Sequence, residues 1–403
     1  MTTETATPEL LAAAREIQPD VVAIRRRLHR QPEVGLDLPR SQAVIAEELA
    51  RLGLVPRSGV ALRSIRATIE GARPGPKTLL RADMDALPLH EDTGLEFASE
   101  VDGAMHACGH DTHVAMLLGA ARLLVERRDG LAGTVELMFQ PGEEGYAGAR
   151  LMIDEGLLDD LDPASTTAFA IHISTRYPAS TIDLRAGAML AANDTLRIHV
   201  RGRGGHASTP HLAVDPIFVA AQIVTGLQGI VGRRVDAFDP AVITIAHVIA
   251  GTTTNIIPEE AVLEGTIRTV SETSRDGVHT AIRELVPGLA AAFGATAEAD
   301  IERGYPVTVN DPRVTALVRE AAVGLVGPDG VVDLGAPIMG AEDFSYVLQR
   351  VPGVMAFLGA QPPGTDPATA PQNHSNVVVF DEDSMALGVA LHAAVALRVA
   401  GGQ

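Results

Sequence analysis

The sequence predicts an α/β protein: a large domain with a mostly parallel sheet covered by helices, interrupted by a smaller ferredoxin-like α+β domain. Helical and strand patterns alternate in the first half of the chain, which is typical of a parallel sheet with helices on both faces. From about Gly187 the pattern changes to the β-α-β-β-α-β order of a ferredoxin-like unit. Because β-α signals resume after Asn310, we expect the small domain to be inserted into the large one.

The elements of the large domain follow from apolar periodicity and from the turn residues that bound each run. We expect helices at Val21 to His29, Ser41 to Leu52 and Val114 to Arg128, and strands at Lys77 to Asp85, Thr134 to Gln140 and Thr167 to Ile173. The loops beyond the carboxyl ends of parallel strands usually carry the functional site, so the search for function starts there.

The inserted domain is predicted from four strands and two helices. The strands are Thr195 to Arg201, Ala241 to Ala250, Ala261 to Val270 and Thr296 to Arg303, and the helices are Asp215 to Arg233 and Arg275 to Phe293. The large domain then continues with a helix near Val314 to Val326 and a strand at Asn376 to Phe380. We therefore expect domain segments 1–186, 187–303 and 304–403.

Composition excludes several classes of protein. A formal net charge of −19 with a single lysine, Lys77, argues against a nucleic-acid partner. Cys108 is the only cysteine, so an intrachain disulfide is impossible and a reducing compartment fits. The first 20 residues carry acids and proline where a signal peptide would be basic and then apolar. We expect a soluble, cytoplasmic protein without a membrane partner.

Candidate metal ligands gather in the segment HACGHDTH, residues 106–113, directly before a predicted helix. Cys108 and His110 are separated only by Gly109, whose backbone freedom lets both side chains face one side. Upstream, Asp83 and Asp85 end a predicted strand and point the same way. These aspartates either bind metal or orient a histidine that does.

Three further segments add donors at the ends of predicted strands. Glu143 and Glu144 follow one strand, His172 ends the next, and His374 precedes the strand predicted at Asn376 to Phe380. One of the adjacent glutamates can bind metal while its neighbour handles protons. Thiolate, imidazole and carboxylate together suit zinc, manganese or cobalt better than magnesium or calcium.

Simpler interpretations compete with this one. A lone histidine such as His172 is more often a structural residue, and a single cysteine is more often a small buried apolar side chain. The HACGHDTH context reverses that expectation for Cys108. The pair Glu47–Glu48 lies in a helical pattern without His or Cys nearby and is interpreted as a solvated face.

The chain resembles the M20 metallopeptidase clan, within it the amidohydrolase branch of hippurate hydrolases, auxin-conjugate hydrolases and N-acyl-amino-acid deacylases. The resemblance runs nearly end to end. Its motifs are RRRLHRQPEVG (25–35), RADMDALPL (81–89), MHACGHDTH (105–113), FQPGEEGYAGA (139–149), GRGGHASTPH (202–211), NIIPEEAVLEGTIR (255–268) and GAEDFSY (340–346). Seven motifs in the family's order are far more specific than any one of them.

The resemblance implies a metal-dependent amidohydrolase that cleaves small N-acyl amino acids with two divalent ions, Mn, Zn or Co. It implies that the ions are bound by Cys108, His110, Glu144, His172 and His374. Glu143 is then the general base, His206 stabilises the oxyanion, and Asn255 and Arg268 recognise the substrate's carboxylate end. It further implies that the inserted domain acts as a lid and as the contact surface of a homodimer, with a monomer as the alternative.

Two stretches depart from the family's pattern, and three other functions compete. His172 is followed by Ile-Ser-Thr-Arg-Tyr-Pro, and His374 is preceded by Ala-Pro-Gln-Asn, so no acyl-group preference is carried over. The alternatives are a dipeptidase or carboxypeptidase of the same clan, a non-catalytic relative that binds acyl-amino acids, and a thiol hydrolase with Cys108 as nucleophile.

Overall fold

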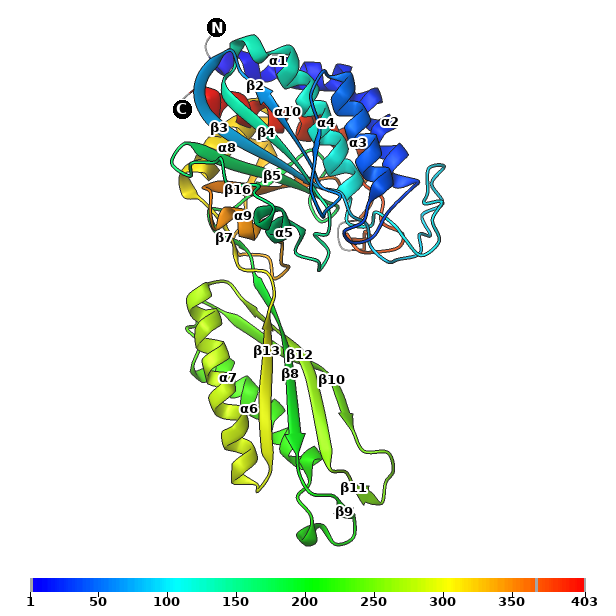
Figure 1. The fold of residues 1–403 in the computed structure, drawn as a ribbon, viewed down its shortest axis with the longest axis vertical. Coiled ribbons are helices and arrows are strands. Elements are labelled where there is room, and N and C mark those ends of the chain that lie inside the picture. Colours follow the sequence, from blue (N-terminus) through cyan, green and yellow to red (C-terminus); the bar gives the residue numbers. More distant parts are fainter. Residues whose placement is uncertain (1–2, 367–368, 402–403) are drawn as a thin grey trace. The chain divides into compact units, whose positions relative to one another are not determined.

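The computed structural model describes residues 3–366 and 369–401, and its contacts divide the chain into two compact units (Figure 1). One unit comprises Met1–Met189, Val309–Ala336 and Tyr346–Gln403, and the other comprises Leu190–Thr308 and Pro337–Ser345. The domain boundaries at 187 and 304 stay a prediction. No sequence pattern indicated that Pro337–Ser345 groups with the inserted segment.

The first unit contains an eight-stranded sheet of order β1-β2-β4-β3-β5-β16-β6-β15. Its strands are β1 Arg57–Ser58, β2 Ile65–Glu70, β3 Arg73–Asp83, β4 Ala132–Gln140, β5 Thr166–Ser174, β6 Ile182–Leu184, β15 Val331–Asp333 and β16 Gly353–Gly359. The inner strands β4, β3, β5 and β16 run parallel, and antiparallel pairs flank them. The predicted mostly parallel α/β sheet is confirmed.

Helices cover this sheet and supply most of its core. They are α1 Thr3–Glu16, α2 Gln18–His29, α3 Pro39–Arg51, α4 His110–Glu126, α5 Gly148–Asp154, α8 Pro312–Val326, α9 Ser345–Leu348 and α10 Met385–Ala400. Helices α4 and α10 lie side by side (Figure 1). A Cβ at Gly388 would lie 2.1 Å from Met116 Sδ, so a larger residue there would force the Met116 side chain to move.

One helical stretch among the described residues, Glu382–Ala400, is long and apolar enough to cross a membrane. Most of it is buried inside the protein, where α10 packs against α1, α4 and α8. Its apolar sequence is therefore accounted for by the core.

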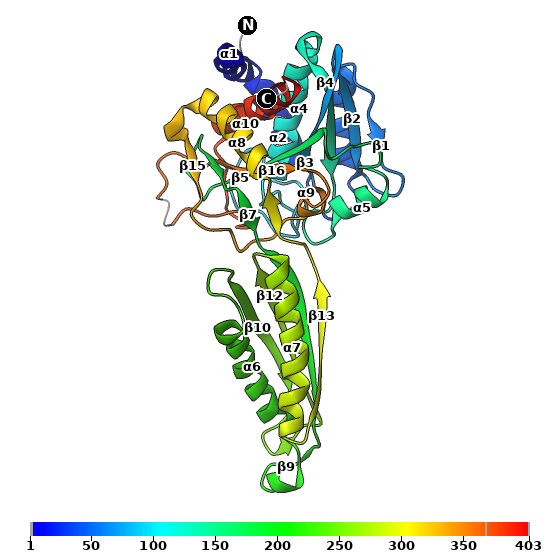
Figure 2. The same cartoon turned by 90° about the vertical axis from the view of Figure 1, so that its left-hand side faces the viewer.

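The second unit has the predicted ferredoxin-like order. Its elements are β8 Ala192–Arg201, α6 Pro216–Arg233, β10 Ala241–Ala250, β12 Glu260–Thr269, α7 Glu272–Ala292 and β13 Thr296–Arg303. The strands form an antiparallel sheet of order β10-β12-β8-β13, and Figure 2 shows both helices on one of its faces. The short strand β9 Gly205–His206 of this unit pairs with β11 Ile256–Ile257. Strands β7 Gly187–Leu190 and β14 Thr308–Asn310, which pair with each other, each contain a point at which the chain passes from one unit to the other.

The strand predicted at Asn376 to Phe380 is wrong. This segment is a loop whose turn is closed by the amide of Val378, which donates to the carbonyl of Ser375. Val378 and Phe380 are buried in a small cluster with Met105 and Ile173. The alternating apolar pattern of the segment therefore resembles that of a strand, although the segment pairs with no strand among the described residues. Strand β16 has no counterpart among the predicted strands, because it is buried along its whole length and shows no alternation.

The buried carboxyl of Asp183 in β6 should make stability depend on pH. Burial raises its pKa to about 6, against the hydrogen bond from Thr181 Oγ1. The folded state therefore holds this proton more tightly than the unfolded state, and the resulting stabilisation is complete below about pH 4 and lost as the pH rises through 6. We expect Asp183→Asn to stabilise the protein at pH 7.5 and to change little at pH 4.

Chemical denaturation at both pH values measures this effect. The exposed Asp329, changed to Asn, is the matched control. An equal change in unfolding free energy at pH 4 and pH 7.5 would show that Asp183 is not the titrating group.

Candidate functional site

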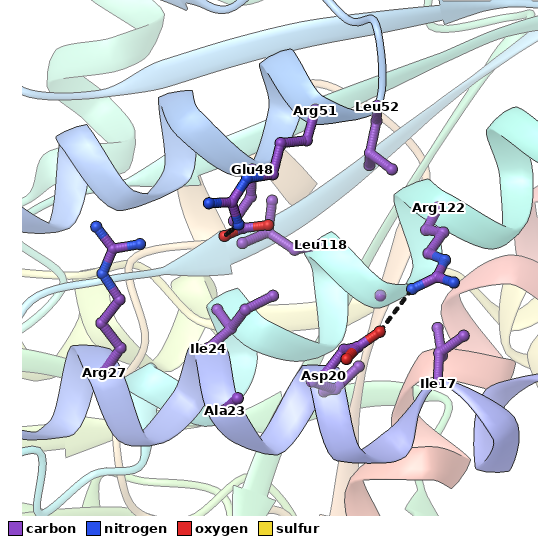
Figure 3. A pocket seen from close by; sticks show the side chains of 12 residues that line it. Ile17, Asp20, Ala23, Ile24, Arg27, Glu48, Arg51, Leu52, Leu118 and Arg122 are labelled. Atoms are coloured by element: carbon purple, nitrogen blue, oxygen red, sulfur yellow. Dashed lines mark hydrogen bonds and ion pairs between the residues drawn. The ribbon is translucent and has the colours of Figure 1, made fainter.

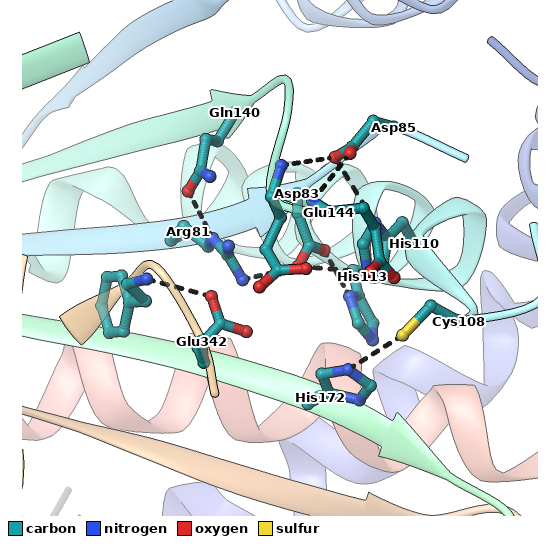
Figure 4. A network of polar contacts seen from close by, with 12 residues as sticks. Arg81, Asp83, Asp85, Cys108, His110, His113, Gln140, Glu144, His172 and Glu342 are labelled. Atoms are coloured by element: carbon teal, nitrogen blue, oxygen red, sulfur yellow. Dashed lines mark hydrogen bonds and ion pairs between the residues drawn. The ribbon is translucent and has the colours of Figure 1, made fainter. Parts of the chain in front are cut away.

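The five predicted ligands come together in the first unit, at the carboxyl ends of its parallel strands. Their donor atoms are closely spaced: Cys108 Sγ lies 3.3 Å from His172 Nε2 and 3.2 Å from His374 Nε2. His374 Nε2 also lies 3.2 Å from Glu144 Oε1. Figure 4 shows the approach of Cys108 to His172, with His110 and Glu144 beside them. Segments far apart in sequence thus converge on one thiol.

Two overlapping groups of donors share that thiol. Cys108, His110 and His172 form one group, and Cys108, Glu144 and His374 form the other; within each group the ligand atoms lie within 4.8 Å of one another. Each group is suited to one metal ion, with Cys108 common to both.

The chemistry of His110 supports a metal at this place. Its ring is fully buried, and neither ring nitrogen has a hydrogen-bond partner among the described residues. The nearest carboxylate oxygens, of Asp83 and Asp85, are 3.5 and 3.6 Å away. A buried ring whose nitrogens make no close hydrogen bond is costly, and coordination of a metal ion would reduce that cost.

His172 is also in the form that a metal requires. Burial lowers its pKa to about 3, so the ring is neutral near pH 7. Its Nδ1 donates to the carbonyl oxygen of Ile173 at 2.7 Å, which leaves Nε2 directed at Cys108. A neutral imidazole whose other nitrogen is hydrogen-bonded is the usual histidine ligand.

Gly109 allows Cys108 and His110 to lie in one site. Its φ of +85° is left-handed, and a Cβ there would lie 2.4 Å from the Ile173 side chain. Any other residue would clash or be strained, so the turn between the thiol and the start of α4 requires glycine.

Asp85 orients the adjacent glutamates. Its two carboxylate oxygens accept hydrogen bonds from the backbone amides of Glu143 at 2.9 Å and Glu144 at 3.1 Å. Figure 4 shows Asp85 beside Glu144. Both glutamates follow β4, and the carboxylate of Glu143 lies within 4.8 Å of donor atoms of His110 and Glu144. Asp85 therefore fixes where the loop presents these two side chains.

Asp83 orients the ring of His113 by accepting a hydrogen bond from it. No separate role for His113 was evident from the sequence alone. His113 Nε2 accepts the backbone amide of Ile173 at 2.8 Å, so His113 Nδ1 carries the proton that it donates to Asp83 at 2.5 Å. Burial would raise the pKa of Asp83, but the charge of Arg81 and the hydrogen bond from His113 hold it well below its usual range. Arg81 Nη1 also lies 2.6 Å from Asp83 Oδ2. Both interactions are consistent with Asp83 orienting His113 and not binding metal itself.

His29, at the end of α2, supports the first turn of α4. His29 Nδ1 and Arg25 Nε both lie 2.8 Å from the same oxygen of buried Asp111. Burial would raise the pKa of Asp111, but Arg25 and His29 hold it far below its usual range. This ion cluster anchors the helix turn that carries His110.

The three residues predicted to contact substrate lie in the second unit and do not form one cluster. His206 in β9 pairs with Ile256 of β11, and the carbonyl of Asn255 accepts the amide of Ala207 at 3.1 Å. Arg268 lies near the other end of β12, which begins at Glu260, roughly 26 Å along the strand. His206 and Asn255 are neighbours, whereas Arg268 is separate.

A cavity of about 590 Å³ lies elsewhere in the first unit, between α2, α3 and α4 (Figure 3). Its arginines are already paired: Arg122 with Asp20 at 2.8 Å, Arg51 with Glu48 at 2.6 Å and Arg27 with Glu47 at 2.8 Å. No predicted site residue lines this cavity. The converging donors, and not this hollow, mark the functional site.

Comparison with known proteins agrees with the motifs. The profile of peptidase family M20/M25/M40 matches residues 79–398. Thermostable carboxypeptidase 1 of Saccharolobus solfataricus is 41% identical over 95% of this chain and 96% of its own length. N-acetylcysteine deacetylase of Bacillus subtilis is 36% identical over 94% of this chain and 96% of its own.

A plant relative and a solved structure extend this similarity. An IAA-amino acid hydrolase of Arabidopsis thaliana, ILR1-like 2, is 36% identical over 94% of this chain and 84% of its own length. The Bacillus subtilis YXEP protein, a dinuclear metal binding peptidase from the M20 family, superposes with a TM-score of 0.82 at 33% identity. That superposition covers 95% of this chain and 98% of the YXEP chain.

We expect Asp85→Asn to weaken metal binding about 10- to 100-fold, as loss of a ligand-orienting contact usually does. The amide nitrogen of Asn cannot accept one of the two backbone amides that Asp85 now accepts. Calorimetric titration of metal-stripped protein measures the effect. Asp102→Asn, on a side chain that is 94% exposed, is the control, and an unchanged dissociation constant in Asp85→Asn would contradict the assignment.

Proposed function

We propose that this chain, which belongs to peptidase family M20/M25/M40, is a metal-dependent amidohydrolase that cleaves the amide bond of small N-acyl amino acids. The observation that carries the proposal is the pair of donor groups joined at Cys108, with the Glu143 carboxylate beside them. Relatives named N-acetylcysteine deacetylase and IAA-amino acid hydrolase support acyl-amino acids as the substrate class. The earlier family assignment is confirmed.

Two divalent ions, Mn, Zn or Co, would be held by Cys108, His110 and His172 on one side and by Cys108, Glu144 and His374 on the other. When bound, they would supply Lewis-acid polarisation of the scissile carbonyl and lower the pKa of an attacking water. The YXEP protein is described as a dinuclear metal binding peptidase, which supports two ions and not one.

Glu143 is the residue proposed to move protons. Its side chain is 6% exposed, and its backbone is fixed by Asp85. The carboxylate takes a proton from the attacking water and returns it to the departing amine. One carboxylate can perform both transfers because they occur in succession and in opposite directions.

The thiol-hydrolase alternative is disfavoured by the environment of Cys108. Burial raises the pKa of its thiol, and the nearby histidines only partly offset this. Reactive cysteines have a lowered pKa and an accessible thiol, whereas this thiol is 6% exposed and lies among metal-ligand donors.

A carboxypeptidase is the second candidate. It is favoured by 41% identity to thermostable carboxypeptidase 1 over nearly the whole chain. In both candidates the bond cleaved is an amide next to an amino-acid carboxylate. The two candidates differ in the group on the acyl side of that bond, which is a simple acyl group for the amidohydrolase and a peptide for the carboxypeptidase.

A substrate panel tests the function directly. Protein stripped with EDTA and reloaded with manganese, zinc or cobalt is assayed on N-acetyl, N-benzoyl and indoleacetyl amino acids and on blocked dipeptides. Metal-restored cleavage of the acyl-amino acids supports the amidohydrolase, and preference for the dipeptides supports the carboxypeptidase. Stoichiometric metal binding without cleavage of any compound would favour the alternative of a non-catalytic relative that only binds acyl-amino acids.

Glu143→Gln should retain both metal ions and lose at least about 100-fold in kcat, since a neutral amide cannot accept the proton. Metal content and turnover are measured on the same preparation. The exposed Glu96, changed to Gln, is the matched control. Near-normal kcat in Glu143→Gln would refute the general-base assignment.

We further propose that two copies pair through the inserted segment, with His206 of one copy stabilising the oxyanion at the other copy's metal ions. Within one chain, His206 pairs with β11, which precedes β12, whereas Arg268 lies roughly 26 Å along β12 from its first residue, Glu260. One small acyl-amino acid is too short to contact both residues. The edge strand β10 exposes Val248 and Ile249, which gives a second copy an apolar edge to cover.

Mixing two inactive variants tests this pairing. His206→Ala should lose about 100- to 1000-fold in kcat, as expected for an oxyanion donor. After subunit exchange with Glu143→Gln, random pairing should restore about a quarter of wild-type activity, because one intact site forms in each mixed dimer. His211→Ala, in the same exposed loop, is the control. No recovery in a mixture that light scattering shows to be dimeric would mean that His206 acts within its own chain.

We also propose a cytoplasmic location. Its support is the single, buried and unpaired Cys108, which a reducing compartment would preserve as a ligand.

A further inference from the structure

We propose that Asn373 is a positioning residue that ties three ligand-bearing segments together and so sets the metal affinity of the site. The inference rests on the proposed metal site but not on the identity of the substrate. Asn373 lies in the stretch that departs from the family's pattern before His374, and the sequence analysis gave it no role.

The Asn373 side chain bridges two of the segments directly. Its Nδ2 donates to the carbonyl oxygen of Cys108 at 3.1 Å and to that of Ile173 at 3.0 Å. Its Oδ1 accepts the backbone amide of Thr175 at 3.3 Å. One amide side chain therefore joins the loop before α4 to the end of β5.

These contacts act on the residues that present donors. Cys108 carries the thiol common to both groups, so fixing its carbonyl limits where Sγ can point. The Ile173 carbonyl also accepts the proton of His172 Nδ1 and thereby sets the direction of the His172 ring. Asn373 thus holds the acceptor that orients His172.

The third segment is the loop that contains Asn373 itself and the next residue, His374. The His374 amide donates to the Ala107 carbonyl at 2.9 Å, and its φ is +71°, a left-handed conformation unusual for a residue with a side chain. Its imidazole is 54% exposed, so packing does not hold it as it holds His110. The hydrogen bonds around Asn373 take the place of packing.

Cobalt titration of metal-stripped Asn373→Ala and Asn373→Leu tests the proposal. Leu keeps the branched shape and the number of side-chain heavy atoms of Asn but makes none of its hydrogen bonds, so it remains informative if the Ala variant fails to fold. We expect both variants to bind cobalt about 10- to 100-fold more weakly in at least one binding step. The thiolate-to-cobalt absorption should also change, because Cys108 is no longer held in place.

Asn376→Ala is the matched control, since Asn376 is in the same loop and its side chain makes no hydrogen bond among the described residues. Wild-type cobalt affinity and spectrum in the Leu variant, even with a lowered Tm of the metal-free protein, would overturn the proposal. If the wild type binds cobalt but cleaves no amide, the proposed function fails while this comparison still decides the role of Asn373. If the wild type binds no cobalt, both fail.

Discussion

The thiol of Cys108 is the point on which the rest of the site depends, because it belongs to both groups of donors. Several constraints of the surrounding chain follow from its place. Gly109 must be glycine so that the chain can turn from the thiol to His110 without striking Ile173. The thiol is buried, and burial raises its pKa, which suits a ligand that metal ions deprotonate better than a free nucleophile.

The parallel sheet explains how donors from distant segments reach this thiol. Strands β3, β4 and β5 end at the same edge, so Asp85 after β3, the paired glutamates after β4 and His172 near the end of β5 lie together. The paired register of β5 with β3 stops at Ala170, which leaves the amide of Ile173 without a partner in the ladder. His113 accepts that amide, and the end of β5 is held in place.

Much of the fold and of the candidate site is predictable from local sequence. Periodicity located most helices and strands of both units, and the dense HACGHDTH segment predicted Cys108 and His110 as ligands, whose donor atoms the structure brings close together. The two errors in the strand predictions share a cause, because the apolar pattern reports burial of side chains and not the pairing of strands. Strand β16 is buried on both faces and lacks alternation, and the loop containing Val378 and Phe380 alternates because two side chains enter one apolar cluster.

The orienting residues could not be found in this way. His113 and Asn373 act on backbone groups of residues 60 and 200 positions away, and no local pattern reports such contacts. The position of His113 inside the ligand-rich segment was the one available signal. For Asn373 the signal was only a departure from the family's pattern before His374, and its meaning required the three-dimensional contacts.

The central claim is that Cys108 is shared by two metal ions. Anomalous diffraction from crystals of the cobalt- or zinc-loaded protein, recorded at the absorption edge of the metal, tests it most directly. The account predicts two separate peaks that both bond to Cys108 Sγ, one near His110 and His172 and the other near Glu144 and His374. A single peak, or two peaks of which one lacks the thiol as a ligand, would contradict it.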